Sequence, residues 1–539
     1  MSDHLHVLTR GEALHSFQEE AVNHLSESRR HLMVEAAPGR GKSLIAVHSC
    51  LMAATRGERA LWLVPLRELV REKATLLRTV SSQADGSIFP NDISEGLGGE
   101  VDLGFSASAI TVATYEWCFY HPSDPPGLLV IDEAQELSDP QRGSLLAKVV
   151  LAFLSTLQPP RIVLLGHGLA KEWSLMLPQV IAVVDREPPA FDLNFLPGHN
   201  SRGSLLTLLE ELLTKNHQEQ IALFVSHVKS ACTLAPAIHD HLTDRPQGYC
   251  RGPLWARAFH AGLPREEKEE IITSLHKGTL PIVVSTTALA KGIDLPLTTV
   301  IVRDLHLPGR GSISVNELNQ LGGRCGRRGR RGKVYVLRGR EKTGRERHPD
   351  RLEILGLLLH FSLMEPKTVG ELLRPWEEQL DRTDLASLFS LLDRYVALGT
   401  IVRKGDLLAL SSCGRILLES ELPVEKVSRW IGFFREVGRF SPTPFDLFLL
   451  YATVFFPTGS FPREQNPTAS STIWDRWLSR GMWEQYGVSL SLKKPLTGRQ
   501  REYLLGYASA LMSRVQPGGE TPRGFSTLEK LATTDCQGG

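Results

Sequence analysis

Residues 32–47 read LMVEAAPGRGKSLIAV, an apolar run followed by a glycine-marked loop and the start of a helical pattern. The small residues Ala36, Gly39 and Gly41 would let backbone N–H groups curl around an anion, and the helix N-terminus beyond them adds partial positive charge. Lys42 would reach the β- and γ-phosphates of a nucleotide, and Ser43 would ligate Mg²⁺. Ala36 stands where the usual pattern has glycine, so a chance glycine-rich turn is the alternative for this stretch alone. The whole loop comprises Ala36, Ala37, Pro38, Gly39, Arg40, Gly41, Lys42 and Ser43.

Two adjacent carboxylates end a second apolar run. Residues 128–131 read LLVI, and Asp132 and Glu133 follow them. Charges at the end of a buried strand are costly unless a cation is held there. Asp132 is therefore placed to hold Mg²⁺, and Glu133 to orient and deprotonate an attacking water. Taken alone the pair could equally be a solvated turn, but together with the phosphate loop upstream it favours a nucleotide site.

Composition bounds the class of protein. The chain has 539 residues, 42% hydrophobic and 22% charged, which is typical of a folded protein of several domains. Its net charge of +1 excludes a globally basic nucleic-acid binder but not a local basic groove. The 7 cysteines are scattered without a CxxC pair, which argues against a disulfide scaffold or a zinc ribbon. No signal peptide is evident, so we expect a soluble cytoplasmic protein.

Apolar runs alternate with amphipathic stretches twice along the chain, which predicts two tandem α/β domains with parallel sheets. Residues 187–203 contain prolines and glycines and are expected to form a linker between them. In the first block we expect helices at 69–80 and 143–157. The expected strands are 32–35, 60–64, 110–113, 127–131 and 161–165 in the first block, and 221–225, 282–285, 300–302 and 333–337 in the second.

The alternation stops beyond residue 345. Helices followed by a short hairpin at 400–410 are typical of a winged helix, and the remainder is helical and rich in aromatic residues. The tail after Gln516 is rich in Gly, Pro and Thr and is expected to be poorly ordered. The predicted domains are 1–190 and 191–345 (both α/β), 346–422 (winged helix) and 423–539 (a helical, aromatic-rich region with a flexible tail).

A basic motif in the second block could complete the nucleotide site. Gln320, Arg324 and Arg327 are spaced i, i+4 and i+7, so they would share one face of a helix. Guanidinium groups presented by a second domain to a γ-phosphate act as an arginine finger, which stabilises charge in the transition state. Arg327 is the first choice for this role and Arg324 the second, and a solvated basic helix is the alternative.

Eight motifs in order resemble those of the superfamily-two helicases, and within them the superkiller-like branch that includes archaeal DNA repair helicases. The resemblance implies two RecA-like domains followed by a winged helix, with ATP and Mg²⁺ as cofactors. The matching stretches are Phe17-Gln18, residues 63–69 (LVPLREL), 112–116 (VATYE), 132–135 (DEAQ), 223–226 (LFVS), 259–263 (FHAGL), 285–296 (STTALAKGIDLP) and 320–327 (QLGGRCGR).

The resemblance also assigns roles residue by residue. Gln18 would read adenine, and Gly292 and Asp294 would lie at the nucleotide. Nucleic acid would be held by Pro65, Arg67, Thr114, Ser226, His260 and Thr286.

Two departures from the family pattern bear on activity. Gly166-His167-Gly168 stand where the family has Ser-Ala-Thr, the motif that is thought to couple hydrolysis to strand separation. Gln135 replaces the histidine that ends the family's DEAH box. ATP hydrolysis is therefore better supported than unwinding.

The family implies a monomeric motor on single-stranded or tailed-duplex DNA, 3′→5′, that unwinds duplexes. The absence of residues for a large arch insertion favours DNA over RNA. The alternatives are an RNA helicase or RNA-remodelling ATPase, and an ATP-switched clamp that does not unwind.

Two further features could contact DNA. Residues 300–315 predict a hairpin that would wedge a duplex apart, or else an ordinary surface loop. Trp474 and Trp477 lie one helical turn apart in the aromatic-rich region and could stack on unpaired bases. Because aromatic clusters are usually core, burial is the stronger interpretation of that region.

Overall fold

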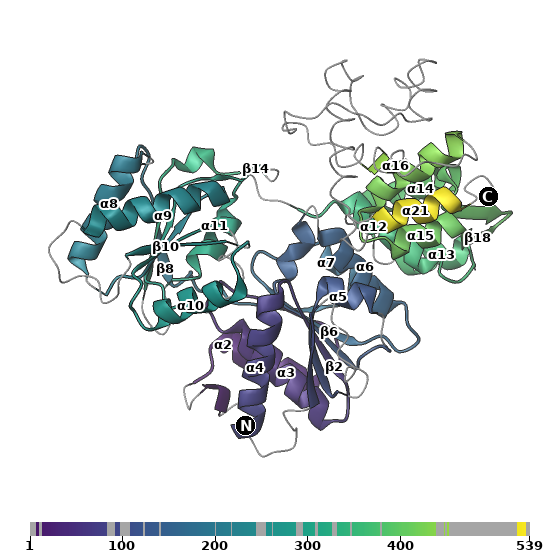
Figure 1. The fold of residues 1–539 in the computed structure, drawn as a ribbon. Coiled ribbons are helices and arrows are strands. Elements are labelled where there is room, and N and C mark those ends of the chain that lie inside the picture. Colours follow the sequence, from purple (N-terminus) through teal and green to yellow (C-terminus); the bar gives the residue numbers. More distant parts are fainter. Residues whose placement is uncertain are drawn as a thin grey trace, which may run out of the picture. The chain divides into compact units, whose positions relative to one another are not determined.

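The computed structural model describes most of the first 437 residues and short pieces beyond them (Figure 1). The chain divides into two compact units, one of Met1–Glu136, Pro160–Ala170 and Gln179–His348, the other of Leu137–Pro159, Lys171–Pro178 and Pro349–Gly539. The described residues are 7–9, 13–83, 92–97, 108–121, 124–139, 142–199, 201–216, 218–243, 255–260, 262–286, 295–307, 311–325, 331–344, 348–377, 380–437, 447, 450–451 and 525–534.

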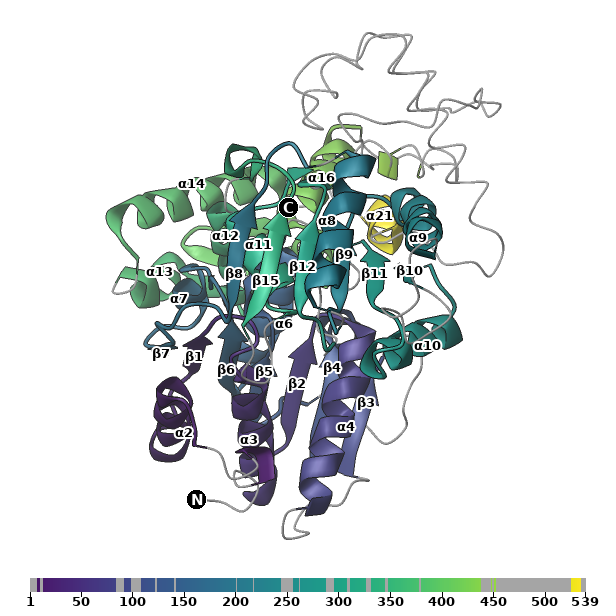
Figure 2. The ribbon, with the colours of Figure 1, turned by 90° about the vertical axis from the view of Figure 1, so that its left-hand side faces the viewer.

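The first unit contains two parallel sheets. Among the described residues the first sheet has the strand order β3-β4-β2-β5-β6-β1-β7 (Figure 2). Its strands are β1 (Leu32–Glu35), β2 (Ala60–Val64), β3 (Ile93–Gly96), β4 (Ile110–Thr114), β5 (Leu128–Ile131), β6 (Arg161–Gly166) and β7 (Ile181–Val184). Its helices are α2 (Ser16–Glu27), α3 (Lys42–Thr55), α4 (Arg67–Gln83), α5 (Tyr115–Tyr120) and the 3-10 helix η3 (Ala134–Ser138). Val34, Trp62 and Val130 are fully buried in the core that α2, α3 and α4 build with this sheet.

The second sheet has the order β10-β11-β9-β12-β15-β8 (Figure 2). Its strands are β8 (Phe191–Phe195), β9 (Ile221–Phe224), β10 (Ala256–Phe259), β11 (Ile282–Ser285), β12 (Thr299–Val302) and β15 (Gly332–Val336). Helices α8 (Arg202–Lys215) and α9 (Val228–Thr243) bury Leu209 and Ile238 against one face, whereas α10 (Arg265–His276) and α11 (Val315–Gly322) bury Ile271 and Leu318 against the other. The predicted pair of RecA-like α/β domains is therefore confirmed.

The predicted linker is wrong in part. Within residues 187–203, Phe191–Phe195 form β8, an edge strand that pairs with β15 in parallel. Phe191, Leu193 and Phe195 alternate with polar residues, which is the period-2 pattern of a strand with one buried face. The neighbouring prolines outweighed that pattern in the prediction. The edge strands β3, β7 and β10 were also missed.

The predicted hairpin is present but short. β13 (His306–Leu307) pairs antiparallel with β14 (Gly311–Ser312), and residues 300–302 belong instead to β12 of the parallel sheet. A short 3-10 helix, η5 (Arg340–Lys342), follows β15.

The second unit is mostly helical and has the helix–helix–hairpin order predicted for a winged helix. Among the described residues its sheet has the order β16-β18-β17. The elements are α6 (Gly143–Leu154), α7 (Trp173–Met176), α12 (Arg351–Ser362), β16 (Lys367–Thr368), α13 (Val369–Glu377), α14 (Arg382–Leu398), β17 (Ile401–Lys404), β18 (Leu407–Leu410), α15 (Ser412–Glu419), α16 (Val424–Val437) and α21 (Phe525–Thr533).

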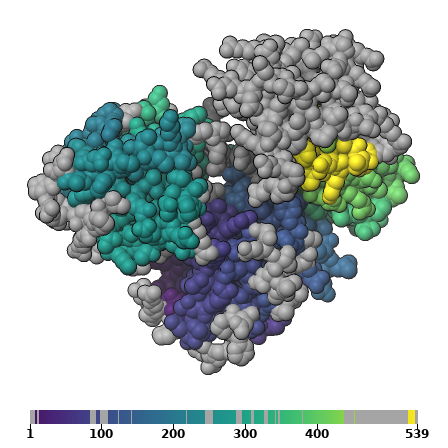
Figure 3. Space-filling view, viewed as in Figure 1, coloured from purple at the N-terminus to yellow at the C-terminus, as the bar shows by residue number. Residues whose placement is uncertain are grey.

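Part of the tail is helical, which corrects the expectation of a poorly ordered tail. In α21, Phe525, Leu528 and Leu531 recur at helical spacing and are buried, and the helix packs on α15 and α16 (yellow in Figure 3). Trp430, Phe433 and Phe434 of α16 are buried as well. For these aromatic residues the core interpretation is confirmed.

A buried ammonium joins α6 to the end of α15. Lys148 is 1% exposed, and its Nζ donates to the carbonyl oxygens of Leu417 (2.9 Å), Ser420 (2.6 Å) and Leu422 (2.7 Å). Three acceptors satisfy the three donors of an ammonium, which is what makes its burial tolerable. Helix α6, which follows Asp132 and Glu133 in sequence, is thereby held to residues 417–422.

His360 is a second buried titratable group of this unit. Its ring is fully buried, with Nδ1 2.7 Å from the carbonyl oxygen of Gly356, Nε2 3.1 Å from Thr400 Oγ1, and Tyr395 edge-on. Burial lowers the pKa of His360 from 6.5 to about 4. The neutral ring is therefore the form that this unit accommodates.

We expect the free energy of unfolding of this unit to fall as the pH falls from 7 to 5. The unfolded state binds the proton more tightly in that range, so the stability is present above pH 6.5 and is lost toward pH 4. The loss due to His360 is about 2 kcal/mol between pH 7 and 5. Urea unfolding at the two pH values measures it. His360→Gln should remove that part of the slope, whereas His199→Gln, an exposed control, should not; equal slopes in all three proteins would refute the assignment.

No helix in the described part of the chain is long and apolar enough to span a bilayer. The five cysteines that the structure describes form no disulfide with one another.

Candidate nucleotide-binding site

The phosphate loop connects β1 to α3. Gly39 and Gly41 have φ values of 83° and 82°, a left-handed conformation that favours glycine. Ala36 is buried, and its N–H donates to the carbonyl oxygen of Gly166 at 3.0 Å, which extends the β1–β6 pairing by one residue. A side chain at this position is therefore compatible with the loop, and glycine is needed only further along.

Gln18 braces the loop from α2. Its side chain is buried, and Nε2 donates to the carbonyl oxygens of Arg40 (3.3 Å) and Gly41 (3.2 Å). A Cβ atom added at Gly41 would lie 2.7 Å from this nitrogen, so a larger residue there would displace the end of the Gln18 side chain. Recognition of adenine by Gln18 stays a prediction.

Arg40 ties the other side of the loop to the residues that follow β7. Its Nε is 2.8 Å from Asp185 Oδ2, and its Nη2 is 2.8 Å from Glu187 Oε2. The Asp185 side chain is only 3% exposed, so the pair is shielded from solvent. Arg40 thus holds the loop in place, a role that its position in the motif did not predict.

Lys42 begins α3 and points back into the loop. Its Nζ donates to the carbonyl oxygens of Ala36 (2.6 Å) and Ala37 (3.1 Å). Burial lowers the pKa of Lys42, and the carboxylates of Glu133 and Asp132 oppose that shift. The ammonium therefore lies in the electrostatic reach of both carboxylates.

Asp132 and Glu133 lie at the carboxyl end of β5, as predicted. Burial, and next the neighbouring Glu133, raise the pKa of Asp132 to about 6. Burial also disfavours the charged form of Glu133, but Lys42 and then Arg324 outweigh it and lower the pKa of Glu133. Glu133 has a φ of 53°, which is uncommon for a residue other than glycine and is typical of functional sites. Glu133 is thus kept charged, as a base must be.

The donor set beside the loop fits Mg²⁺. It offers the hydroxyl of Ser43 and the carboxylate of Asp132, both of them oxygen ligands. The buried Asp132 carboxyl carries a raised pKa, which a divalent cation next to it would lower. Ser43 and Asp132 are therefore the residues that would hold the metal.

Lys73 reaches the same place from α4, and the sequence analysis missed it. It is 8% exposed, and its Nζ lies 3.2 Å from Ser43 Oγ and 2.9 Å from Glu72 Oε1. Its charge lowers the pKa of both Asp132 and Glu133. The pattern contained a signal, because Leu69, Lys73 and Leu77 recur every four residues on the buried face of the helix.

The altered motif at 166–168 is connected to the site through its backbone. The N–H of His167 donates to Gln135 Oε1 at 3.3 Å, and the N–H of Gly168 donates to Glu35 Oε1 at 3.1 Å. Gln135 Nε2 also donates to Glu133 Oε2. Gln135 therefore bridges Glu133 and the altered motif, a link that needs no side chain from His167.

The helix predicted for Gln320, Arg324 and Arg327 is shorter than expected. α11 ends at Gly322, so Arg324 lies in the following turn and does not continue the helical face of the half-buried Gln320. Two successive glycines disfavour helix, and the bridge between Leu297 and Cys325 redirects the chain. Arg324 is nevertheless buried and acts electrostatically on Lys42 and Glu133.

Gly323 explains how this turn approaches the phosphate loop. A Cβ atom added there would lie 2.1 Å from the Cβ of Pro38, so no larger residue fits without a shift. Arg327, the first choice for the finger, lies outside the described residues, as do Gly292, Asp294, Trp474 and Trp477.

The predicted nucleic-acid residues follow the carboxyl ends of strands. In the first sheet Val64 pairs with Thr114, so Pro65 and Arg67 leave the sheet at the edge where Thr114 ends β4. In the second sheet Phe224, Ser285 and Phe259 are in register. Thr286 and His260 come directly after Ser285 and Phe259, and Ser226 comes two positions after Phe224.

The predicted nucleic-acid residues differ in exposure and in the hydrogen bonds that they already make. Arg67 is exposed, whereas the buried Thr114 hydroxyl accepts the N–H of Trp117 and caps α5. Ser226 is bonded to Asp304 through its N–H (3.0 Å) and its hydroxyl (3.3 Å).

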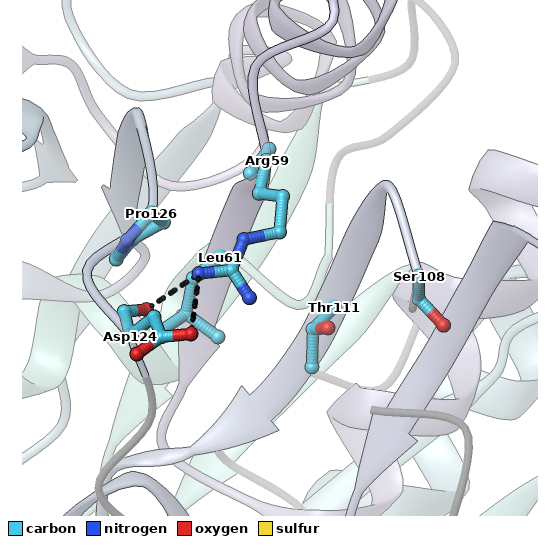
Figure 4. A pocket seen from close by; sticks show the side chains of 7 residues that line it. Arg59, Leu61, Ser108, Thr111, Asp124 and Pro126 are labelled. Carbon is cyan, nitrogen blue, oxygen red and sulfur yellow. Dashed lines mark hydrogen bonds and ion pairs between the residues drawn. The ribbon is translucent and has the colours of Figure 1, made fainter. Parts of the chain in front are cut away.

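A small pocket lies elsewhere in the first sheet. Arg59, Leu61, Ser108, Thr111, Asp124 and Pro126 line it, and Arg59 donates to the carbonyl oxygen of Asp124 at 2.9 Å (Figure 4). Ala60 and Ile110 are the first residues of β2 and β4, so the pocket lies near the amino ends of these strands. The phosphate loop and the carboxylates follow carboxyl ends, and the pocket is not part of their site.

A phosphate loop beside paired carboxylates, with a second parallel-sheet domain that supplies an arginine, defines a P-loop protein with two RecA-like domains. The DEAD/DEAH box helicase family matches residues 15–166, and the helicase conserved C-terminal domain matches residues 204–329. The chain belongs to the superfamily-two helicases.

Individual relatives are distant. The chain is 26% identical to "Putative helicase 7" of Sulfolobus islandicus filamentous virus, over 58% of this chain and 53% of that protein. It is 26% identical to the ATP-dependent DNA helicase Hel308 of Thermoplasma acidophilum, over 58% of this chain and 50% of that protein. The chain thus spans about half the length of these relatives. The solved DUF1998 helicase MrfA, bound to DNA, has a similar fold (TM-score 0.55, 19% identity, 76% of this chain and 63% of that chain).

Proposed function

We propose that this chain is an ATP-dependent helicase that moves 3′→5′ along single-stranded DNA and separates duplex DNA. The observation that carries the proposal is the charge arrangement around Lys42. Its ammonium interacts with Asp132 and Glu133 of the first domain and with Arg324 of the second. A site made from both domains suits a motor whose hydrolysis depends on how the domains meet.

Each group would have one role. Lys42 would bind the β- and γ-phosphates, Glu133 would orient and deprotonate water, and Arg324 with Arg327 would stabilise charge in the transition state. Mg²⁺, held by Ser43 and Asp132, would neutralise the phosphates. Lys42 and then Arg324 favour the charged form of Glu133 and lower its pKa, which supports Glu133 as the base.

DNA is favoured as the substrate by one of the named relatives. Hel308 of Thermoplasma acidophilum is a DNA helicase by name. A strand across the carboxyl edges of the sheets would contact Arg67, Ser226, His260 and Thr286. The polarity rests on the resemblance of the motifs to the archaeal repair helicases.

An ATP-switched clamp that does not unwind is the second candidate. Residues 166–168 lack the hydroxyl groups of the family's motif, and the backbone N–H groups of His167 and Gly168 donate to Gln135 and Glu35. If that motif couples hydrolysis to strand separation, the coupling here depends on Gln135. We further propose a cytoplasmic location for a monomeric protein; the location rests on the scattered cysteines.

We expect single-stranded DNA to stimulate ATP turnover, because a strand that contacts both domains favours the arrangement that brings Arg324 to the phosphates. Most contacts would go to phosphates, so the stimulation should weaken steeply with salt and depend little on sequence. Turnover measured with single-stranded DNA, single-stranded RNA and duplex at two salt concentrations tests this. Arg67→Ala should raise the DNA concentration for half-maximal stimulation, whereas Arg71→Ala, an exposed control on the same helix, should not.

Strand displacement on tailed DNA and RNA duplexes separates the candidates. Displacement of DNA supports the proposal. Displacement of RNA alone would favour an RNA helicase, and DNA-stimulated turnover without displacement would favour the clamp. Turnover that no nucleic acid changes would refute a motor.

A further inference from the structure

Lys73 is a buried cation at the hydroxyl expected to ligate Mg²⁺. Its Nζ is 3.2 Å from Ser43 Oγ, and its side chain is 10% exposed. Its Nζ also lies 2.9 Å from Glu72 Oε1, and the Glu72 side chain is 35% exposed. The ammonium therefore has one partner inside the site and one toward solvent.

A metal on Ser43 would meet this ammonium at short range. Mg²⁺ binds oxygen at 2.0–2.1 Å, so the two cations would be separated by no more than about 5 Å. In a buried site the repulsion between a divalent ion and an ammonium at that distance is large compared with thermal energy. Both cations would also attract Asp132 and Glu133, on which Lys73 already acts. They compete for the same negative groups.

We propose that Lys73 is a built-in cation of the nucleotide site, which substitutes in part for Mg²⁺ and is displaced toward Glu72 when the metal binds. The inference rests on the proposed nucleotide site and deepens it. As a consequence, the affinity for nucleotide should depend less on Mg²⁺ than it would in a site that has Asp132 and Glu133 but lacks Lys73. Lys73 acts through Ser43 and the carboxylates, so it is a positioning residue.

The test is the affinity for ADP by calorimetry, measured with Mg²⁺ and with EDTA. The quantity of interest is the ratio of the dissociation constant in EDTA to that in Mg²⁺. In Lys73→Met the ratio should rise by about tenfold, because no cation remains to substitute for the metal and none opposes it. Lys73→Arg keeps the charge and should keep the wild-type ratio. Arg71→Met, on the exposed face of the same helix, is the matched control and should also leave it unchanged.

In a second variant the ratio of the two dissociation constants should change in the opposite direction. Glu72→Gln weakens the partner toward which the ammonium withdraws, so the metal should displace it less easily and the ratio should fall. Thermal melting of each variant without nucleotide shows whether it is folded, and a ratio of two affinities in one protein is insensitive to a partial loss of active protein.

Each outcome decides. A raised ratio in Lys73→Met with a lowered one in Glu72→Gln supports the built-in cation. An unchanged ratio in Lys73→Met would mean that Lys73 only fills space, and a lowered one that it assists the metal; either overturns the proposal while leaving the nucleotide site intact. Wild-type protein that binds no ADP in either buffer would overturn the nucleotide site itself.

Discussion

Glu133→Gln should lower the turnover of ATP by about 100-fold or more while leaving nucleotide binding nearly unchanged. The amide has the shape of the carboxylate, so Gln135 Nε2 keeps an oxygen to which it can donate. What is lost is the charge that Lys42 and Arg324 favour in the folded protein. Without that charge water is not deprotonated, whereas Lys42, Ser43 and Asp132 still hold the nucleotide. Steady-state turnover and calorimetry with ADP and Mg²⁺ measure the two effects.

Glu20→Gln provides the control, since it removes a carboxylate from an exposed position of α2. It should reproduce the wild-type kcat. Normal hydrolysis by Glu133→Gln would show that another group activates water, and loss of ADP binding together with kcat would make Glu133 a binding residue.

Lys42→Ala should weaken nucleotide binding severely and lower kcat/KM by about 1000-fold. The other cation of the loop, Arg40, is held by Asp185 and Glu187. The Nζ of Lys42 is already directed at the loop through the carbonyl oxygens of Ala36 and Ala37. Alanine leaves the β- and γ-phosphates without that charge and leaves those carbonyl oxygens without a donor. ADP with Mg²⁺ should therefore raise the melting temperature of wild type and of Glu133→Gln, but not that of Lys42→Ala.

Lys277→Ala, in an exposed turn after α10, is the comparison for a lost lysine and should behave as wild type. A melting temperature of Lys42→Ala that still rises with ADP would contradict the role of this loop. The two variants together distinguish a defect in chemistry from a defect in binding.

Local patterns predicted the parts of the site that lie close together in sequence. The phosphate loop, Asp132 and Glu133 each follow an apolar run, and a strand that ends in polar residues is visible without knowledge of the fold. The partners of Arg40 could not be found in this way, because Asp185 is 145 residues away and comes close only when β7 pairs beside β1. Lys73 was hidden for a similar reason, since Ser43 is 30 residues distant.

Two of the wrong predictions concern segments in which prolines or glycines accompany a regular spacing of apolar residues. Prolines near Phe191 suggested a linker although alternation predicted a strand, and the glycines of the tail concealed the helical spacing of Phe525, Leu528 and Leu531. For Arg324 the reverse held: helical spacing was extended through Gly322 and Gly323, where the helix ends. A periodic spacing predicts a helix only over residues that the helix includes, and α11 ends at Gly322.

The ammonium of Lys148 limits how the chain can be cut. A truncated chain that stops before Leu417 would retain α6 but lose every one of the three carbonyl groups to which Lys148 donates. A chain that also lacked α12, the helix that packs on α6, would leave Leu145, Val149 and Leu151, now buried, with less cover. A fragment that carries only the two parallel sheets should therefore expose apolar side chains of α6 and aggregate. It would do so although it holds every residue proposed for ATP hydrolysis. A low ATPase activity measured on such a fragment would then reflect misfolding and not a defect in catalysis.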